Sequence, residues 1–498
     1  MTLERAPGSR PNIVLFVADE LRADALACYG NPVVQTPNFD RLASEGVLFE
    51  DCHVQFPVCA ASRCSLLTGW PASTRGHRSL YHLLRPDEPN LFRYLRQAGY
   101  DVFWFGRNDA LASQTFHDSV TRWSNVRPDS LNYTPDHAPE APQAITFLSQ
   151  ATGDRRQSWD YRMLQEAFAV LGRREPQRPF CIFLPLFQPH PPYGAPDGFH
   201  DLYRPQDVPS LAPPDLPGKP DFHPALRASY GLDAVSETTF RRIRAIYQGQ
   251  VSYCDWLLGE LLAALERTGH VDDTALFAFA DHGDYAGDYG LVEKWPSGLE
   301  DALTHVPLIV RAPGGQAGRR VINVVELFDV MATCLDLAGV EARHTHFARS
   351  LTPQLHGDAG DPERAAFAEG GYNTFEPQCF EPADQAAGVY AEKLLLQNRL
   401  PSIVARSAMI RTRTHKLVMR STGGCELYEI GGDALEQRNR FGDPQMAAIQ
   451  GDLQARLLAR YIDTSGVTPT DRDPRGLPPY HALPAFPNAP EAGAAPPR

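Results

Sequence analysis

The chain has 498 residues, of which 43% are hydrophobic, and a formal net charge of −13 at pH 7. This length exceeds the usual size of one α/β domain, so we expect a large domain and a smaller one. An acidic surface repels nucleic acids and anionic membranes, which argues against either as a partner. A small anionic substrate stays compatible with this charge if basic side chains gather in one cleft.

Two features of the chain bear on its location in the cell. Residues 1–11 contain no apolar run of signal-peptide length, and no later run approaches the length of a membrane span. The nine cysteines, an odd number at scattered positions, fit reduced thiols better than a disulfide framework. We therefore expect a cytoplasmic location.

Short apolar runs along the first two-thirds of the chain predict buried strands. These runs cover residues 12–19, 101–106, 180–186, 274–281 and 306–311. Helical stretches separate them, and one of these has a stripe of apolar residues at spacings of three and four: Val251, Cys254, Leu258, Leu261 and Leu265. The alternation predicts an α/β fold with a large, doubly wound, mostly parallel sheet flanked by helices.

The chain after about residue 345 predicts a smaller α+β subdomain. Its pattern consists of a hairpin formed by 407–420 and 426–430 around Gly423-Gly424, and a helix from Asp443-Pro444 to about Tyr461. The last residues are rich in proline and alanine and predict a surface tail. We therefore divide the chain into residues 1–345, the large α/β domain; 346–474, the smaller subdomain; and 475–498, the tail.

Polar residues follow several of the predicted strands directly. In a doubly wound sheet, ligands bind beyond the carboxyl ends of the parallel strands, so these residues are candidates for a site. They are Asp19, Glu20, Arg107, Asp109, His190, Asp281 and His282.

Residues 56–69 (FPVCAASRCSLLTG) are the densest candidate segment. Residues 60–67 contain no helix breaker, which places Cys59 at or near a helix N-terminus, where free N–H groups and the helix dipole favour an anion. Arg63 lies one turn further along the same face. A nucleophile, a guanidinium and a helix end would therefore converge on one anionic group. The alternative reading is a buried cysteine at a helix start.

The segment Cys59-Ala60-Ala61-Ser62-Arg63 with Leu67-Thr68-Gly69 resembles the Cys-x-Pro-Ser-Arg motif of the sulfatase family, the formylglycine-dependent enzymes of the alkaline-phosphatase-like superfamily. Ala61 stands where the family usually has proline. Further segments resemble family motifs in the same order along the chain: 19–22, 36–42, 188–193, 281–284 with Lys294, and 407–417 with 426–428.

The resemblance implies that a formylglycine-generating maturation enzyme oxidises Cys59 to formylglycine, whose hydrate then attacks the sulfur of the substrate. A hard divalent cation requires oxygen ligands, which Asp19 and Asp281 can supply. The resemblance adds Glu20, His282 and the modified Cys59 as ligands. We expect Ca²⁺, with Mg²⁺ or Mn²⁺ as alternatives. The cation would polarise the ester and lower the pKa of the attacking hydroxyl.

Three further residues are candidates for catalysis within this resemblance. Arg63 and Lys294 would hold the charge that develops in the transition state. His190 would act on the leaving group, because imidazole can donate a proton near neutral pH.

Some positions depart from the family pattern. Arg107 and Asp109 stand where relatives have Lys-x-His, and Tyr289 stands where many have histidine. Arg107 could still bind the anion, whereas Asp109 and Tyr289 are candidates for substrate contact. The acids Glu376 and Glu381 are hypothesised to select a polar or cationic alcohol.

The prediction from the sequence is therefore a sulfatase that hydrolyses a small anionic sulfuric ester. The sequence leaves open whether the chain forms a homo-oligomer. Two alternatives remain. The first is a phosphonate monoester or phosphodiester hydrolase on the same scaffold, since phosphorus and sulfur esters present similar charged tetrahedra. The second is a non-catalytic anion-binding homologue, if Cys59 is not modified.

Overall fold

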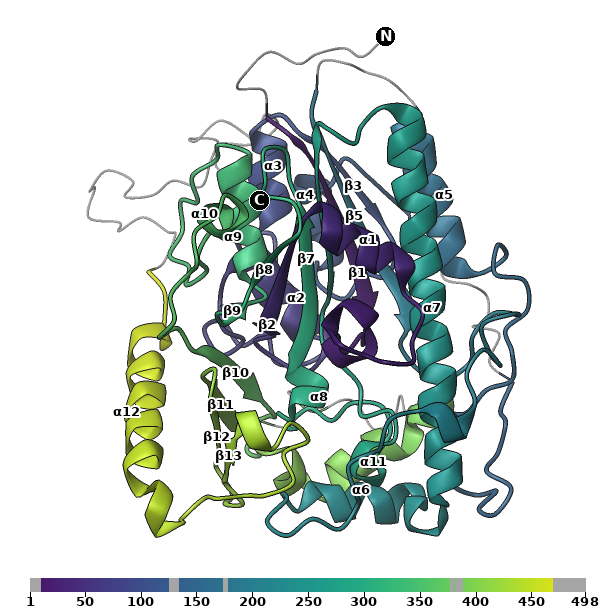
Figure 1. Cartoon of the computed structure of the whole chain (residues 1–498). Helices are drawn as coiled ribbons and strands as arrows, with labels where there is room; N and C mark the ends of the chain where they lie inside the picture. Colours follow the sequence, from purple (N-terminus) through teal and green to yellow (C-terminus); the bar gives the residue numbers. More distant parts are fainter. Residues whose placement is uncertain (1–9, 125–133, 173–177, 377–379, 381–387, 469–498) are drawn as a thin grey trace, which may run out of the picture.

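The computed structural model describes residues 10–124, 134–172, 178–376, 380 and 388–468. A nine-stranded sheet flanked by helices forms the larger part of the molecule, and a four-stranded sheet lies beside its lower end, next to α12 (Figure 1). The large sheet contains β1 (Asn12–Asp19), β2 (Val47–His53), β3 (Asp101–Phe105), β4 (Arg122–Ser124), β5 (Phe180–Pro189), β6 (Thr274–Ala280), β7 (His305–Arg311), β8 (Arg319–Val321) and β9 (Val325–Glu326).

The strand order of the large sheet is β4-β3-β5-β1-β6-β7-β2-β8, with β9 paired to β2. All of its pairs are parallel except the two made by β7, which runs antiparallel to β6 and to β2. All five predicted strands are present, and the predicted mostly parallel α/β sheet is confirmed. The prediction did not anticipate the antiparallel direction of β7.

The helices of this part of the chain are α1 (Pro37–Glu45), α2 (Cys59–Thr68), α3 (Leu91–Gln97), α4 (Ser113–Ser119), α5 (Trp159–Leu171), α6 (Phe222–Tyr230), α7 (Glu237–Thr268), α8 (Asp301–Thr304), α9 (Asp329–Leu337) and α10 (Thr352–Leu355). In α7, the side chain of Ser236 accepts a hydrogen bond from the Thr239 amide at the start, and Gly269 ends the helix in the left-handed region. The predicted apolar stripe of α7 is buried along its whole length.

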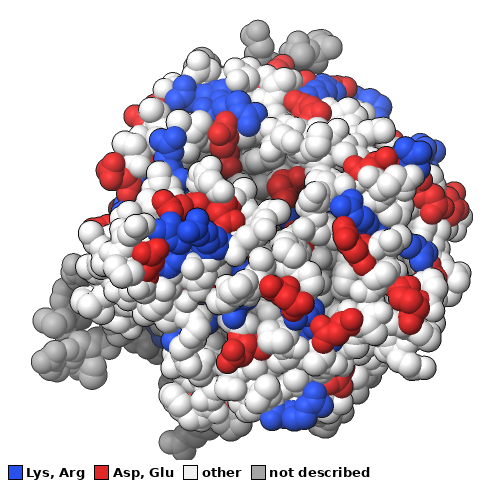
Figure 2. Space-filling model, turned by 60° about the horizontal axis from the view of Figure 1, so that its bottom comes forward, with Lys and Arg blue, Asp and Glu red and all other residues white. Residues whose placement is uncertain are grey.

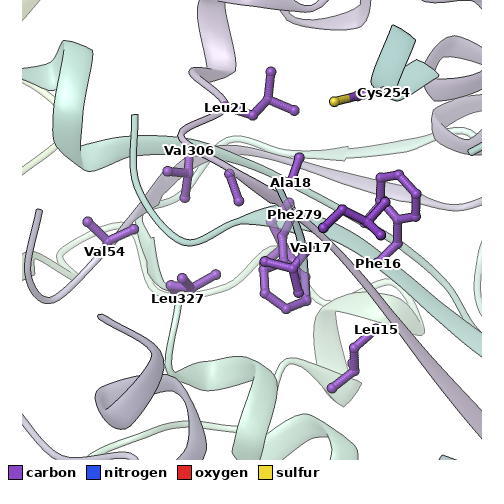
Figure 3. Close-up of a cluster of buried hydrophobic side chains, with 14 of the residues drawn as sticks. Leu15, Phe16, Val17, Ala18, Leu21, Val54, Cys254, Phe279, Val306 and Leu327 are labelled. Carbon is purple, nitrogen blue, oxygen red and sulfur yellow. The ribbon is translucent and has the colours of Figure 1, made fainter. Parts of the chain in front are cut away.

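The core is densest around β1, which lies between β5 and β6. Leu15, Phe16 and Val17 are fully buried, and they pack with Phe279 of β6 (Figure 3). A strand that is buried on both faces has a continuous apolar sequence, which is why β1 could be predicted from the sequence. As a consequence, the acidic residue at the end of this strand, Asp19, lies inside the protein.

The smaller part contains β10 (Ala366–Gly370), β11 (Ser407–Arg411), β12 (His415–Arg420), β13 (Glu426–Glu429), α11 (Ala391–Arg399) and α12 (Ala447–Thr464). The predicted hairpin around Gly423-Gly424 is confirmed as the antiparallel pair β12–β13. Its predicted first arm, 407–420, is wrong in extent, because it divides into β11 and β12, and the amide of Thr412 donates to His415 O between them. The predicted helix is confirmed as α12. The domain boundary at residue 345 stays a prediction, and the tail 475–498 lies outside the described residues.

The eight cysteines in the described residues are all free thiols. Within the same residues, no helix combines the length and the apolar character needed to cross a bilayer.

The N-terminus of α1 is fixed by a carboxylate from α7. Asp255 accepts hydrogen bonds from the amides of Asn38 and Phe39, at 2.8 and 2.9 Å, and from the Asn38 side chain at 2.7 Å. Gly259 permits this approach, since a Cβ there would lie 2.7 Å from Asn38 Nδ2. The carboxylate thus satisfies amides that the first turn of a helix leaves unpaired.

We predict that Asp255→Asn lowers the stability of the protein by about 2 kcal/mol, because an amide cannot accept all three hydrogen bonds. Thermal unfolding should show a midpoint several degrees lower. Asp272→Asn is the matched control, since Asp272 is exposed in the turn after α7. Equal midpoints for the two variants would contradict the capping role.

Candidate active site

The chain turns sharply where β1 ends, and this turn places two carboxylates side by side. Glu20 has a φ of 68°, a left-handed conformation that is unfavourable for a residue with a side chain. The hydroxyl of Tyr247 fixes the turn, because it donates to the Glu20 carbonyl at 2.7 Å and accepts from the Arg22 amide at 3.0 Å. Asp19 and Glu20 are both fully buried.

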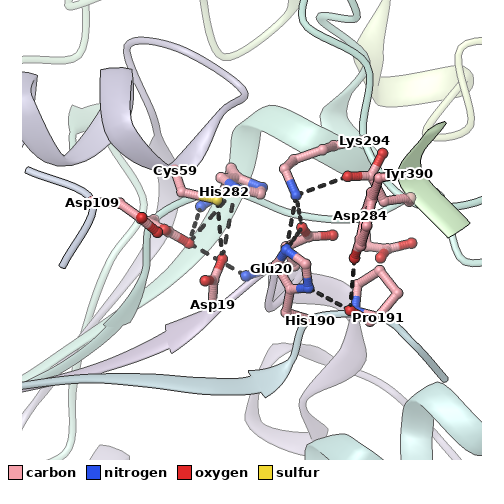
Figure 4. Close-up of polar contacts among 12 residues, drawn as sticks. Asp19, Glu20, Cys59, Asp109, His190, Pro191, His282, Asp284, Lys294 and Tyr390 are labelled. Atoms are coloured by element: carbon pink, nitrogen blue, oxygen red, sulfur yellow. Dashed lines mark hydrogen bonds and ion pairs between the residues drawn. The ribbon is translucent and has the colours of Figure 1, made fainter. Parts of the chain in front are cut away.

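Cys59 is the first residue of α2, as the sequence predicted. Its thiol donates to Asp19 Oδ1 at 3.5 Å, and its sulfur lies 3.2 Å from His282 Nε2 (Figure 4). Burial first, and then the charge of Asp19, raise the pKa of the Cys59 thiol well above its usual value. The unmodified side chain is therefore a protonated thiol and a poor nucleophile.

Asp281 and His282 follow directly after β6. The carboxylate of Asp281 accepts hydrogen bonds from the amides of Glu20 and His282, at 3.3 and 3.0 Å. His282 Nδ1 lies 2.9 Å from Gly283 O, so this nitrogen is the donor and Nε2 is left to face Cys59. Gly283 allows the close packing of this turn, since a Cβ there would lie 2.0 Å from Ala302 O.

The ligand atoms of Asp19, Cys59, Asp281 and His282 lie within 4.8 Å of one another, and all four residues are buried. Burial lowers the pKa of His282, so its ring is neutral and Nε2 can act as a ligand. Two carboxylates, an imidazole and the atom at position 59 are a donor set that fits a divalent cation. Glu20 Oε2 is also buried without a hydrogen-bond partner.

Two guanidinium groups lie against the same carboxylates. Arg63 is fully buried, and it contacts Asp281 Oδ2 through Nε at 2.8 Å and Asp19 Oδ2 through Nη2 at 3.0 Å. Arg107 contacts Asp19 at 3.0 Å and Asp109 at 2.6 Å. The Arg107 side chain is 28% exposed, which places it between the buried carboxylates and solvent. Asp109 thus contacts Arg107 and, at 3.6 Å, Arg63.

A second group of charges surrounds Glu20 (Figure 4). Lys294 forms an ion pair with Glu20 Oε1 and lies 3.1 Å from His190 Nε2. His190 Nδ1 lies 2.5 Å from Pro191 O, so Nδ1 donates and Nε2 accepts. Burial first, and then Lys294 and Arg107, lower the pKa of His190 well below its usual value. The ring is therefore neutral in this state, and its Nε2 accepts a hydrogen bond from Lys294.

Sequence reasoning did not identify Tyr390 as part of this region. Its hydroxyl donates to Pro191 O at 3.0 Å, and its ring lies 6.3 Å from the ring of His190. Tyr390 belongs to the short turn before α11, a segment without a recognisable motif. No local pattern in the sequence could have assigned it to the site.

Two candidates do not join the cluster around Cys59. The hydroxyl of Tyr289 donates to Leu435 O at 2.8 Å, and Lys219 Nζ lies 4.5 Å from the centre of its ring. Glu376 pairs with Arg78 at 2.9 Å, so its charge is compensated within the protein, which argues against the hypothesis of a cation-selecting acid. Glu381 lies outside the described residues.

Figure 2 turns the lower face of the molecule forward, the side toward which the parallel strands end. Acidic and basic side chains are interspersed over this face, and an acidic side chain lies at the base of a hollow near its centre. The face therefore has no single sign of charge.

Comparisons with known proteins agree with this arrangement. The arylsulfatase of Clostridium perfringens is 26% identical over 370 residues, which cover 66% of this chain and 75% of that protein. The choline-sulfatase of Rhizobium meliloti is 28% identical over 472 residues, covering 90% of this chain and 85% of that protein. The solved phosphonate monoester hydrolase of Silicibacter pomeroyi shares the fold, with a TM-score of 0.76 and 24% identity over 95% of this chain and all of that chain.

The sequence model of the sulfatase family matches residues 11–340, which is more than half of the chain. This range includes both strand ends, the start of α2 and the residues after β6. The chain belongs to the sulfatase family.

Proposed function

We propose that the protein hydrolyses sulfuric esters with a nucleophile derived from Cys59 and a divalent cation held by Asp19, Asp281 and His282. The observation that carries this proposal is the position of Cys59 at the N-terminus of α2, facing these three residues. The relatives named for arylsulfatase and choline-sulfatase activity support a sulfuric ester as substrate. Ca²⁺ is the cation we favour, because the side chains offer mainly oxygen.

The side chains around position 59 fit a divalent cation and a formylglycine, and these two groups would add chemistry to that of the side chains. When bound, the cation would polarise the ester oxygens, and the hydrate of formylglycine at position 59 would supply the attacking hydroxyl. Arg63 and Lys294 flank this position and would hold the negative charge of the sulfuryl group. Arg107, which is nearer to solvent, would meet the anion as it enters, and Asp109 orients its guanidinium.

The contacts of His190 indicate how its ring is oriented. Its Nδ1 donates to Pro191 O, so Nε2 points its lone pair toward Lys294. His190 would therefore start as a neutral ring oriented by Lys294, and it would act beside the leaving alcohol while Lys294 stays charged.

Maturation must precede complete folding. Cys59 is fully buried, so a formylglycine-generating enzyme could reach it only in the unfolded or partly folded chain. The free thiols of the other described cysteines fit a reducing compartment, which supports the cytoplasm as the location.

A second candidate is the hydrolysis of phosphonate monoesters. The chain shares the fold of the phosphonate monoester hydrolase of Silicibacter pomeroyi over nearly its whole length. Arg63, Arg107 and Lys294 would recognise a singly charged tetrahedral group whether its centre is sulfur or phosphorus. The choice between the two candidates therefore requires direct comparison of substrates.

We predict that the protein hydrolyses 4-nitrophenyl sulfate with a higher kcat/KM than 4-nitrophenyl phenylphosphonate. Cys59→Ala should abolish both activities, because the nucleophile is removed. Cys64→Ala is the matched control, since Cys64 is a buried cysteine of the same helix that contacts Ala110 O. Peptide mass spectrometry should find Cys59 lighter by about 18 Da, the difference between the thiol and the aldehyde.

Two outcomes would change this proposal. A higher kcat/KM for the phosphonate ester would favour the second candidate. Full activity with an unmodified Cys59 thiol would exclude the formylglycine mechanism, and an unmodified thiol without activity would favour a non-catalytic anion-binding protein.

We also predict that Asp281→Asn loses the bound divalent cation, because it removes a buried carboxylate charge from the ligand set. Elemental analysis by mass spectrometry after desalting should find the cation in the parent and in Asp255→Asn, a matched change elsewhere in the fold. Retention of the cation by Asp281→Asn would contradict the assignment of this ligand.

A further inference from the structure

A buried lysine from α11 reaches the neighbourhood of Lys294. Lys393 is 5% exposed, and its ammonium donates to both carboxylate oxygens of Glu293, at 2.8 and 2.7 Å. Figure 1 shows α11 beside α6, at the lower end of the large domain. Lys393 lies beyond residue 340, where the match to the family model ends.

The backbone fixes Glu293 between two ammonium groups. Glu293 has a φ of 60°, its amide donates to the Tyr193 hydroxyl at 2.8 Å, and its carbonyl accepts from the Tyr285 amide at 3.1 Å. Its Oε1 lies 3.0 Å from the ammonium of the next residue, Lys294. The carboxylate therefore contacts Lys294 on one side and Lys393 on the other.

These contacts matter because Lys294 already has a counterion. It forms an ion pair with Glu20, and all four charged side chains of the group are nearly or fully buried. Two ionised carboxylates that shared one ammonium would leave one buried negative charge without compensation, which is costly inside a protein. The ammonium of Lys393 supplies the missing positive charge.

The protonation state of Glu293 agrees with this balance. Burial acts to raise its pKa, but the charges of Lys294 and Lys393 outweigh burial and lower it. The carboxylate is therefore ionised near neutral pH, with both ammonium groups contributing to its lowered pKa.

We propose that Lys393 is a positioning residue: by neutralising Glu293, it leaves the ammonium of Lys294 available to the anionic group at position 59. This inference rests on the proposed function, in which Lys294 contacts that group. A purely structural role for the Lys393–Glu293 pair would predict a loss of stability without a selective effect on catalysis. The two roles can be distinguished in a protein that lacks Lys393. Removal of the Glu293 charge should then restore kcat if Lys393 is a positioning residue, but not if its role is purely structural.

The test uses the full-length protein and three variants. Lys393→Met leaves Glu293 with Lys294 as its only described ammonium partner, and we expect kcat to fall about tenfold or more with a smaller change in KM, as for other residues that orient a catalytic group. Lys393→Arg keeps the charge and should stay close to the parent. Glu293→Gln combined with Lys393→Met removes both charges and should recover most of kcat.

Lys416→Met is the matched control, because Lys416 is also a buried lysine that pairs with two carboxylates, those of Asp301 and Glu436. It should lower the thermal midpoint while kcat stays near that of the parent. A parent-like kcat for Lys393→Met would overturn the proposal. So would a double variant no more active than Lys393→Met, in protein shown to be folded by circular dichroism.

Binding of inorganic sulfate separates this inference from the proposed function. Titration calorimetry should show about tenfold weaker sulfate binding to Lys393→Met than to the parent and to Lys416→Met. If the parent hydrolyses none of the esters but shows this difference, the proposed function fails and the positioning role stands. Equal affinities, or no binding of sulfate by the parent, would overturn the positioning role.

Discussion

The site depends on mutual compensation of buried charges at the ends of two neighbouring strands. Asp19 ends β1 and Asp281 follows β6, and both carboxylates are fully removed from water. An unpaired buried charge costs several kcal/mol, so the fold requires a cation between them. The guanidinium of Arg63 contacts both carboxylates and thereby joins the two strand ends to α2. The same contact places Cys59, one turn earlier, over the strand ends.

Much of this arrangement could be predicted because it follows from local pattern and topology. A central strand must be apolar along its length, so β1 and β6 were visible as continuous runs that end in an acid. Strands that are parallel neighbours bring their carboxyl ends together, which places Asp19 beside Asp281. The segment from Cys59 to Arg63 contains no helix breaker, and the helix then determines which side chains share a face.

The features that were missed depend on contacts between segments with no regular period. Tyr289 has a φ of 59°, so its direction is set by its turn, and it contacts Leu435 instead of Cys59. The turn between β11 and β12 contains neither glycine nor proline, and therefore gave no signal in the sequence. Lys393 resembles any helical lysine in the sequence, because its carboxylate partner is one hundred residues away.

Each cation that would meet the substrate is paired in this structure with at least two carboxylates. Arg63 contacts Asp19 and Asp281, Arg107 contacts Asp19 and Asp109, and Lys294 contacts Glu20 and Glu293. A divalent cation held by Asp19 and Asp281 would draw on the same negative charge that now compensates the two guanidinium groups. Their attraction for an anion would then increase, because less of their own charge is cancelled. In the proposed function, binding of the metal and binding of an anionic ester would thus be coupled through shared carboxylates.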